Sequence, residues 1–165
     1  MKTPPLIRPA AESDLPAILG IYNDAVLNTT AIWNETPVDL ENRRAWFAER
    51  TGRGFPILVA DLGGAIGYGS FGDFRPFEGY RVTVEHSIYV ANESRGQGAG
   101  AALLEALIEA ARKLQKKNMI GAIDAANAPS IALHEKFGFQ KVGRMPGVGV
   151  KFGKPVDLLF MQKVL

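Results

Sequence analysis

Apolar and polar positions alternate along the middle of the chain, and this pattern predicts the strongest strand of the sequence. Over residues 81–90 the valines, the isoleucine and His86 share one face, whereas Thr83, Glu85, Ser87 and Tyr89 share the other. Shorter apolar runs bounded by glycine or proline predict further strands. We expect these strands over residues 6–9, 56–60, 65–71, 119–124, 139–144 and 156–163.

Apolar residues that recur three and four positions apart predict helices. We expect them over residues 14–27, 39–51, 98–114 and 129–137. Asp14 and Asp39 are side chains of the type that caps a first helical turn, and Gly138 is suited to end the last helix. Hairpins followed by alternating strands and helices predict an α/β (α+β) fold with a mixed sheet, formed as one domain over residues 1–165.

Composition removes several classes of function. The 165 residues include no cysteine, which excludes disulfides, thiolate metal sites and a thiol nucleophile, and we expect no metal site. The net charge is only +2 and no long basic run occurs, so nucleic acid is not an expected partner. The N-terminal residues lack an apolar segment of signal-peptide length, and no uncharged stretch could span a bilayer. We therefore expect a cytoplasmic protein without membrane contact.

A glycine-rich segment, residues 90–100, joins the strongest predicted strand to the clearest helix. The first helical turn has unpaired N–H groups, and glycines let an anion approach them, so this geometry suits a phosphate. Arg95 adds a positive charge. Gly96-x-Gly98-x-Gly100 followed by two alanines fits neither a P-loop nor a dinucleotide fingerprint, and a tight turn without ligand is the alternative.

A second segment follows the next predicted strand and opens the next helix. Asn127 and Ser130 fall at the carboxyl edge of the sheet, where open α/β sheets bind ligands. On its own the segment also suits an ordinary capped helix.

The two segments together resemble the GNAT superfamily of N-acetyltransferases. Arg95-x-x-Gly98-x-Gly100 is similar to its pyrophosphate loop, and Asn127 with residues 132–139 is similar to its later motif. Residues 83–90 (TVEHSIYV), 133–135 (LHE) and 32–37 (IWNETP) resemble the phosphinothricin and methionine sulfoximine acetyltransferases within it. The resemblance implies a mixed central sheet with helices on both faces and a splayed central strand pair.

The implied reaction transfers acetyl from acetyl-CoA to the primary amine of a small amino acid, by direct attack in a ternary complex. The resemblance makes Glu85 the candidate base, and His134, Tyr89 or solvent the acid. The pantetheine arm would lie between the splayed strands, where a backbone N–H would stabilise the oxyanion. The implied cofactor-binding residues are Ile88, Tyr89, Val90, Arg95, Gly96, Gln97, Gly98, Ala99, Gly100, Asn127 and Ser130.

The implied acceptor is an amino-acid zwitterion, whose carboxylate suits an arginine fork. Arg75 is the first candidate for this contact and Arg81 the second. The implied substrate-binding residues are Trp33, Arg75, Phe77, Tyr80, Glu85 and Ser87. We also expect a late loop over residues 149–155, with Lys154, that meets a second subunit in a homodimer.

Three other functions compete with this hypothesis. The same cofactor could serve a protein N-terminus or another amine such as a polyamine. A non-catalytic acyl-CoA sensor would have no need of the Glu85 carboxylate. A nucleotide-binding oxidoreductase is disfavoured by the glycine spacing.

Overall fold

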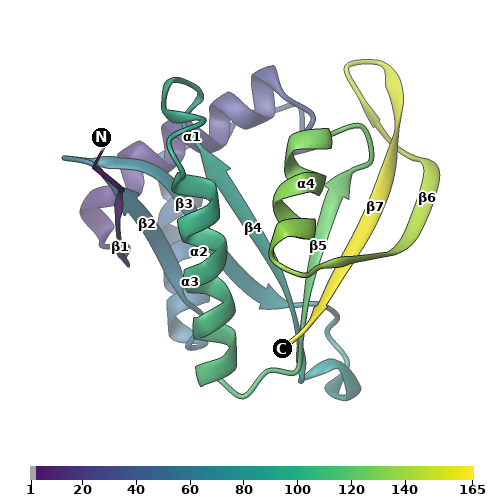
Figure 1. Ribbon diagram of the computed structural model, residues 1–165. Coiled ribbons are helices and arrows are strands. Elements are labelled where there is room, and N and C mark those ends of the chain that lie inside the picture. Colours follow the sequence, from purple (N-terminus) through teal and green to yellow (C-terminus); the bar gives the residue numbers. More distant parts are fainter. Residues whose placement is uncertain (1–2) are drawn as a thin grey trace.

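The computed structural model describes residues 3–165, which form a seven-stranded mixed sheet with four α-helices (Figure 1). The strands lie in the order β1-β2-β3-β4-β5-β7-β6. They are β1 (Leu6–Pro9), β2 (Ile57–Asp61), β3 (Ala65–Asp73), β4 (Thr83–Val90), β5 (Asn118–Asp124), β6 (Gln140–Lys151) and β7 (Lys154–Val164). The helices are α1 (Leu15–Asn28), α2 (Leu40–Gly52), α3 (Ala99–Lys113) and α4 (Ala128–Lys136). No helix in this part of the chain is both long and apolar enough to cross a bilayer.

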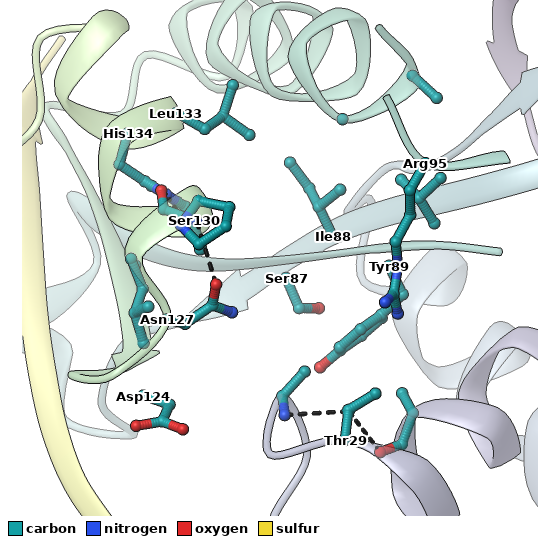
Figure 2. A pocket seen from close by; sticks show the side chains of 18 of the residues that line it. Thr29, Ser87, Ile88, Tyr89, Arg95, Asp124, Asn127, Ser130, Leu133 and His134 are labelled. Atoms are coloured by element: carbon teal, nitrogen blue, oxygen red, sulfur yellow. Dashed lines mark hydrogen bonds between the residues drawn. The ribbon is translucent and has the colours of Figure 1, made fainter. Parts of the chain in front are cut away.

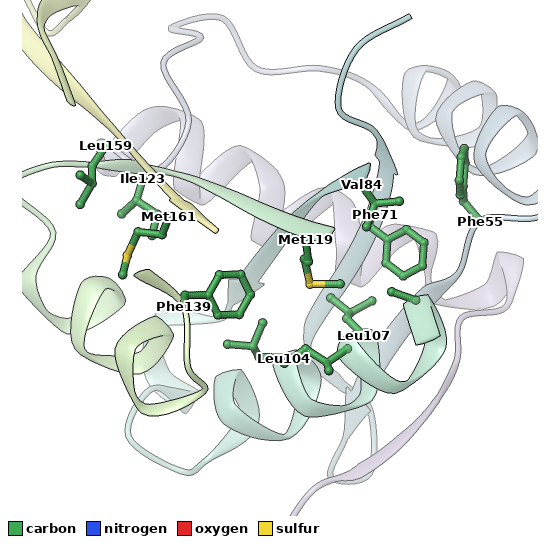
Figure 3. Close-up of a cluster of buried hydrophobic side chains, with 12 residues drawn as sticks. Phe55, Phe71, Val84, Leu104, Leu107, Met119, Ile123, Phe139, Leu159 and Met161 are labelled. Carbon is green, nitrogen blue, oxygen red and sulfur yellow. The ribbon is translucent and has the colours of Figure 1, made fainter. Parts of the chain in front are cut away.

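The helices cover both faces of the sheet, as the resemblance implied. α1 and α2 pack on one face, around Ile57, Val59 and Tyr68. α3 and α4 cover the other, where Leu104, Leu107 and neighbouring apolar side chains form the largest buried cluster (Figure 3). Burial of these side chains is the main stabilising contribution to the fold. The period-2 pattern of β4 therefore sends Glu85, Ser87 and Tyr89 towards α1 and α2.

The central strand pair is splayed, which confirms the expectation. β4 and β5 pair in parallel from Thr83 opposite Asn118 to His86 opposite Gly121. No pairing continues beyond that point, although β4 runs to Val90 and β5 to Asp124. The sheet thus opens at the carboxyl ends of its two central strands.

The glycines of β3 permit α3 to lie close to the sheet. A Cβ atom on Gly69 would lie 2.9 Å from Leu107 Cδ1 and 3.1 Å from Ile88 Cγ1. Any larger residue would push α3 or β4 outward, because packed interiors leave no spare volume. The frequent glycines of this strand are explained by close packing.

Two local predictions were wrong. Asp14 does not cap α1 with its side chain; its carboxylate accepts from Ala11 N–H and from the Arg8 guanidinium at 2.8–2.9 Å. Residues 149–155 are not a loop, because β6 continues to Lys151 and β7 begins at Lys154. Phe152 and Gly153 have φ values of 53° and 71°, so they form a two-residue hairpin turn whose twist matches the strands.

Candidate active site

A cavity of about 480 Å³ occupies the opening between β4 and β5 (Figure 2). Ser87–Val90 form one wall and 121–124 the other, and the first residues of α3 and α4 close it on one side. The end of α1 and residues 29–31 close it on the other. The cavity exists because the two strands separate after His86 and Gly121. If β4 and β5 stayed paired to their ends, no gap would remain between them.

The glycine loop meets the conditions for holding a pyrophosphate. Gly96 and Gly98 have φ values of 74° and 84°, and a Cβ atom on either would point into open space. The first helical hydrogen bond runs from Ala102 N–H to Gly98 O, so the N–H groups of the preceding turn are left for a ligand. The helix dipole adds positive potential there. The cradle therefore fits the diphosphate of acetyl-CoA.

Ten of the eleven predicted cofactor-binding residues line this cavity, and Gln97 does not. The ten are Ile88, Tyr89, Val90, Arg95, Gly96, Gly98, Ala99, Gly100, Asn127 and Ser130. The Gln97 side chain donates back to Glu93 O at 3.4 Å. Asn127 Oδ1 accepts from Ser130 N–H at 3.2 Å, so Asn127 caps α4 and lies in the cavity wall as well.

Tyr89 projects into the cavity from β4, beside Ser87 (Figure 2). Its ring packs against Tyr68 with centroids 5.4 Å apart. Burial raises the pKa of Tyr89 to about 12. The hydroxyl therefore stays protonated at neutral pH and can donate a hydrogen bond into the cavity.

His134 forms a buried pair with His86 on the α3 and α4 side of the sheet. His134 Nδ1 lies 2.6 Å from Ser130 O and must donate to it, because a carbonyl only accepts. His134 Nε2 lies 3.0 Å from His86 Nε2, so His86 donates when both rings are neutral. Burial lowers the pKa of both imidazoles, that of His86 to about 3. Gly121 leaves room for the pair, since its Cβ atom would lie 3.1 Å from His134 Nε2.

Glu85 lies in a second cavity, of about 440 Å³, between α2, β3 and β4. Burial raises the pKa of its carboxyl group, and the nearby Arg75 charge offsets part of that effect. His86 and Ser87 line both cavities, so one stretch of β4 separates the carboxylate from the opening between the strands. A half-buried carboxylate with a raised pKa is suited to accept a proton near neutral pH.

Four of the predicted substrate-binding residues lie outside both cavities. Trp33 packs on Gly149, and its indole N–H donates to Thr30 O at 2.9 Å. Arg75 stacks over the Phe74 ring at 5.2 Å. Phe77 and Tyr80 expose 70% and 44% of their surface. Glu85 and Ser87 are the two predicted residues that line a cavity.

A polar bridge in the cavity wall was not predicted from the sequence. Thr30 Oγ1 donates to Asp124 Oδ2 at 2.5 Å and joins the segment after α1 to the end of β5. Asp124 stands at the carboxyl end of a central strand, a signal that points to a site. Thr30 has no such signal, because only the fold brings residues 94 positions apart together.

The chain matches the family model described as Acetyltransferase (GNAT) family over residues 18–139. It is 60% identical over 158 residues to the L-methionine sulfoximine/L-methionine sulfone acetyltransferase of Pseudomonas aeruginosa, covering 94% of this chain and 92% of that one.

Two solved structures share the fold closely. One is an acetyltransferase from Salmonella typhimurium with its cofactor acetyl-CoA (TM-score 0.96, 49% identity, 99% of this chain and 95% of that one). The other is a ribosomal-protein-alanine N-acetyltransferase from Brucella melitensis (TM-score 0.96, 57% identity, 97% and 99%). The sheet that opens at β4 and β5, the glycine cradle and these similarities agree: the chain belongs to the GNAT family of acetyltransferases and uses acetyl-CoA.

Proposed function

We propose that this acetyltransferase acetylates the primary amine of a small amino acid or analogue, of the methionine sulfoximine, methionine sulfone or phosphinothricin type. The observation that carries the proposal is Glu85, a carboxylate with a raised pKa in a cavity next to the cofactor opening. The Pseudomonas relative, named for methionine sulfoximine and sulfone, supports the same acceptor class.

In this proposal Glu85 takes the proton that the amine must lose before it attacks. An amine with an ordinary pKa is mostly protonated at pH 7, so a base is needed. Bound acetyl-CoA supplies an activated acetyl group as a thioester. The backbone of Ile88–Val90, which has no strand partner on the β5 side, offers N–H groups to the developing charge on oxygen. Arg95 and the glycine cradle hold the diphosphate.

Tyr89 and His134 contribute differently at the leaving sulfur. The Tyr89 hydroxyl can donate a hydrogen bond, but its pKa of about 12 disfavours full proton transfer to a thiolate whose own pKa is near 8.5. His134 has its one N–H committed to Ser130 O and would first need a proton on Nε2. We propose that Tyr89 would donate a hydrogen bond to the departing sulfur, that solvent would supply its proton, and that His134 forms part of the cavity wall.

The remaining predicted acceptor residues would form the entrance. Arg75 lies close enough to Glu85 to affect its pKa, and Phe77 and Tyr80 are exposed on the segment that follows Arg75. An arginine there would attract the carboxylate of an approaching amino acid and keep Glu85 charged. Trp33 holds the segment after α1 against β6 and would act through that segment.

A protein N-terminus is the second candidate acceptor, and one observation favours it. The Brucella structure, which shares 57% of its residues with this chain, is named for a ribosomal-protein alanine. The two acceptors differ in size and in the position of their negative charge, so one assay separates them.

Thiol release from acetyl-CoA tests the proposal. The acceptors are methionine sulfoximine, methionine sulfone, phosphinothricin, spermidine and short peptides with N-terminal alanine. We expect kcat/KM to be highest for the amino-acid analogues. Preference for the peptides would favour the second candidate, and preference for spermidine would refute both.

We further propose that the protein is a cytoplasmic homodimer. β6 is an edge strand, and Val142, Val148 and Val150 on it each expose more than half of their surface. Native edge strands that present apolar side chains are usually covered. Light scattering after size-exclusion chromatography should give twice the mass of 17.9 kDa, and a monomer would refute this assembly.

A further inference from the structure

The cavity that holds Glu85 also contains an arginine without a partner. Arg50 follows Arg43 by two helical turns and Phe47 by one, so it lies on the face of α2 that is turned towards the sheet. Its Nε atom is buried without a hydrogen-bond partner among residues 3–165. Burial lowers its pKa, the direction expected of a cation that is poorly solvated and unpaired.

The acidic residues near Arg50 are already paired with another arginine. Arg53 contacts Glu49 at 3.3 Å and also pairs with Asp73. Both acids line the same cavity as Arg50, yet neither forms an ion pair with it within the described chain. Arg50 therefore presents a guanidinium without an ion-pair partner in residues 3–165, and with free N–H donors, to the cavity. A partly buried guanidinium in this condition is stabilised by an anion that reaches it.

Gly72 determines where the guanidinium of Arg50 lies. A Cβ atom on Gly72 would be 2.6 Å from Arg50 Nη1 and 3.0 Å from Cζ, so the planar group rests on bare backbone. Gly72 is the register partner of Glu85 across β3 and β4. Directly opposed residues of an antiparallel pair project to the same face, with Cβ atoms about 5 Å apart. The guanidinium and the candidate base thus share one face of two adjacent strands.

From this arrangement we propose that Arg50 binds the carboxylate of the acceptor amino acid. The inference rests on the proposed function, because it places the amine of that acceptor at Glu85. An α-amino acid carries its amine and carboxylate on one carbon, so a base and an anion receptor must lie in the same cavity. Arg50 meets this condition, whereas Arg75 lies outside both cavities. The planar fork of arginine also matches a carboxylate in two-point contact.

Gly72 is part of the same proposal. A methyl group there would displace the guanidinium, so Gly72→Ala should impair recognition of the carboxylate although the methyl group is apolar and small. Arg50→Lys keeps the charge but loses the fork, and should recover only part of the affinity. A residue that served stability alone would show neither pattern.

The test compares an acceptor that has a carboxylate with one that lacks it. KM and kcat are measured for methionine sulfone and for its decarboxylated amine, in the parent, Arg50→Met, Arg50→Lys and Gly72→Ala. The control is Arg44→Met, which removes an exposed arginine from the same helix. One lost charge-assisted contact corresponds to roughly a 10- to 100-fold change. We expect KM for methionine sulfone to rise by that factor in Arg50→Met and Gly72→Ala, with KM for acetyl-CoA and for the amine unchanged.

Equal changes for both acceptors, or no change in Arg50→Met, would overturn the role of Arg50 while leaving the proposed function standing. If the parent protein acetylates no amino acid, both the proposed function and the role of Arg50 are overturned. This outcome is seen in the parent protein without any variant, so the two failures are distinguishable. Melting curves verify that each variant is folded. If Arg50→Met does not fold, Arg50→Lys and Gly72→Ala give the same comparison, and an unchanged KM for methionine sulfone in both refutes the inference.

Discussion

Lys151 offers a test of how the cofactor cavity is held in shape. Its side chain is 1% exposed, and its ammonium donates to the carbonyl oxygens of Val26, Ile32 and Asn34 at 2.5, 2.7 and 2.5 Å. These carbonyls belong to the end of α1 and to the segment that follows it. That segment supplies Thr29 and Thr30 to the cavity wall. One side chain from the β6–β7 hairpin therefore fixes a wall of the active site.

Lys151→Met removes the ammonium and keeps most of the aliphatic stem. Three buried or partly buried carbonyls lose their donor, and each buried polar group left without a partner typically costs about 1–3 kcal/mol, so we take about 3–5 kcal/mol for the three together. Packing changes little because methionine is close in volume to the lysine stem. In a chain of this size each kcal/mol shifts the melting temperature by roughly 2–4 °C. We therefore expect a fall of roughly 6–20 °C, together with weaker binding of acetyl-CoA.

Thermal and urea unfolding, followed by circular dichroism, measure the effect. The control is Lys154→Met, because Lys154 is exposed on the same hairpin and should change stability by less than about 0.5 kcal/mol. If Lys151→Met is as stable as Lys154→Met, the ammonium does not hold the segment after α1. If it is destabilised but binds acetyl-CoA normally, the link to the cavity is wrong.

Three further predictions concern the cofactor cradle, the base and the histidine pair. Gly98→Val should abolish the rise in melting temperature caused by acetyl-CoA, because φ is 84° and the side chain would fill the cradle, whereas Gly79→Val should retain the rise. Glu85→Gln should lower kcat by roughly 10²–10⁴-fold. It should also remove the acidic limb of the profile of kcat against pH, which lies above pH 4.5 because burial raises the pKa of Glu85. If the limb is retained in the variant, it belongs to another group. The pKa values of His86 and His134 are lowered on folding, so the unfolded chain binds more protons below pH 6.5. The free energy of unfolding should thus have its full value above pH 6.5 and decrease as the pH falls towards 3. In urea titrations the double variant His86→Gln, His134→Gln should show a weaker dependence of this free energy on pH.

The sequence predicted most elements because their periodicity is local. The alternation over β4, the apolar face of α3 and the glycines between them suffice to place the cofactor cradle. The first half of β6 and most of β7 were predicted, but the later half of β6 was missed because Gly147 and Gly149 interrupt the alternation that marks a strand. Asp14 was assigned to the wrong partner because Arg8, six positions away, reaches it only after β1 and α1 have packed.

The acceptor cavity depends on contacts between distant segments, and these leave no local signal. In the sequence Arg50 is only a charged residue near the end of a polar helix. Its proposed role follows from the position of its guanidinium over Gly72, which the fold alone determines. The His86–His134 contact joins positions 48 residues apart, and it depends on the space that Gly121 leaves beside the two rings. A resemblance to known acetyltransferases indicated Glu85, but the raised pKa that suits it as a base follows from burial between α2 and β4.

The most direct test of the central claim follows the acetyl group itself. Protein, acetyl-CoA labelled with ¹³C in the carbonyl, and methionine sulfoximine are mixed, and ¹³C NMR records the fate of the label while a thiol reagent records free CoA. The account predicts one labelled N-acetyl amino acid for each CoA released, with both rates reduced together in Glu85→Gln. Release of CoA with the label appearing as acetate, or no release at all, would contradict it.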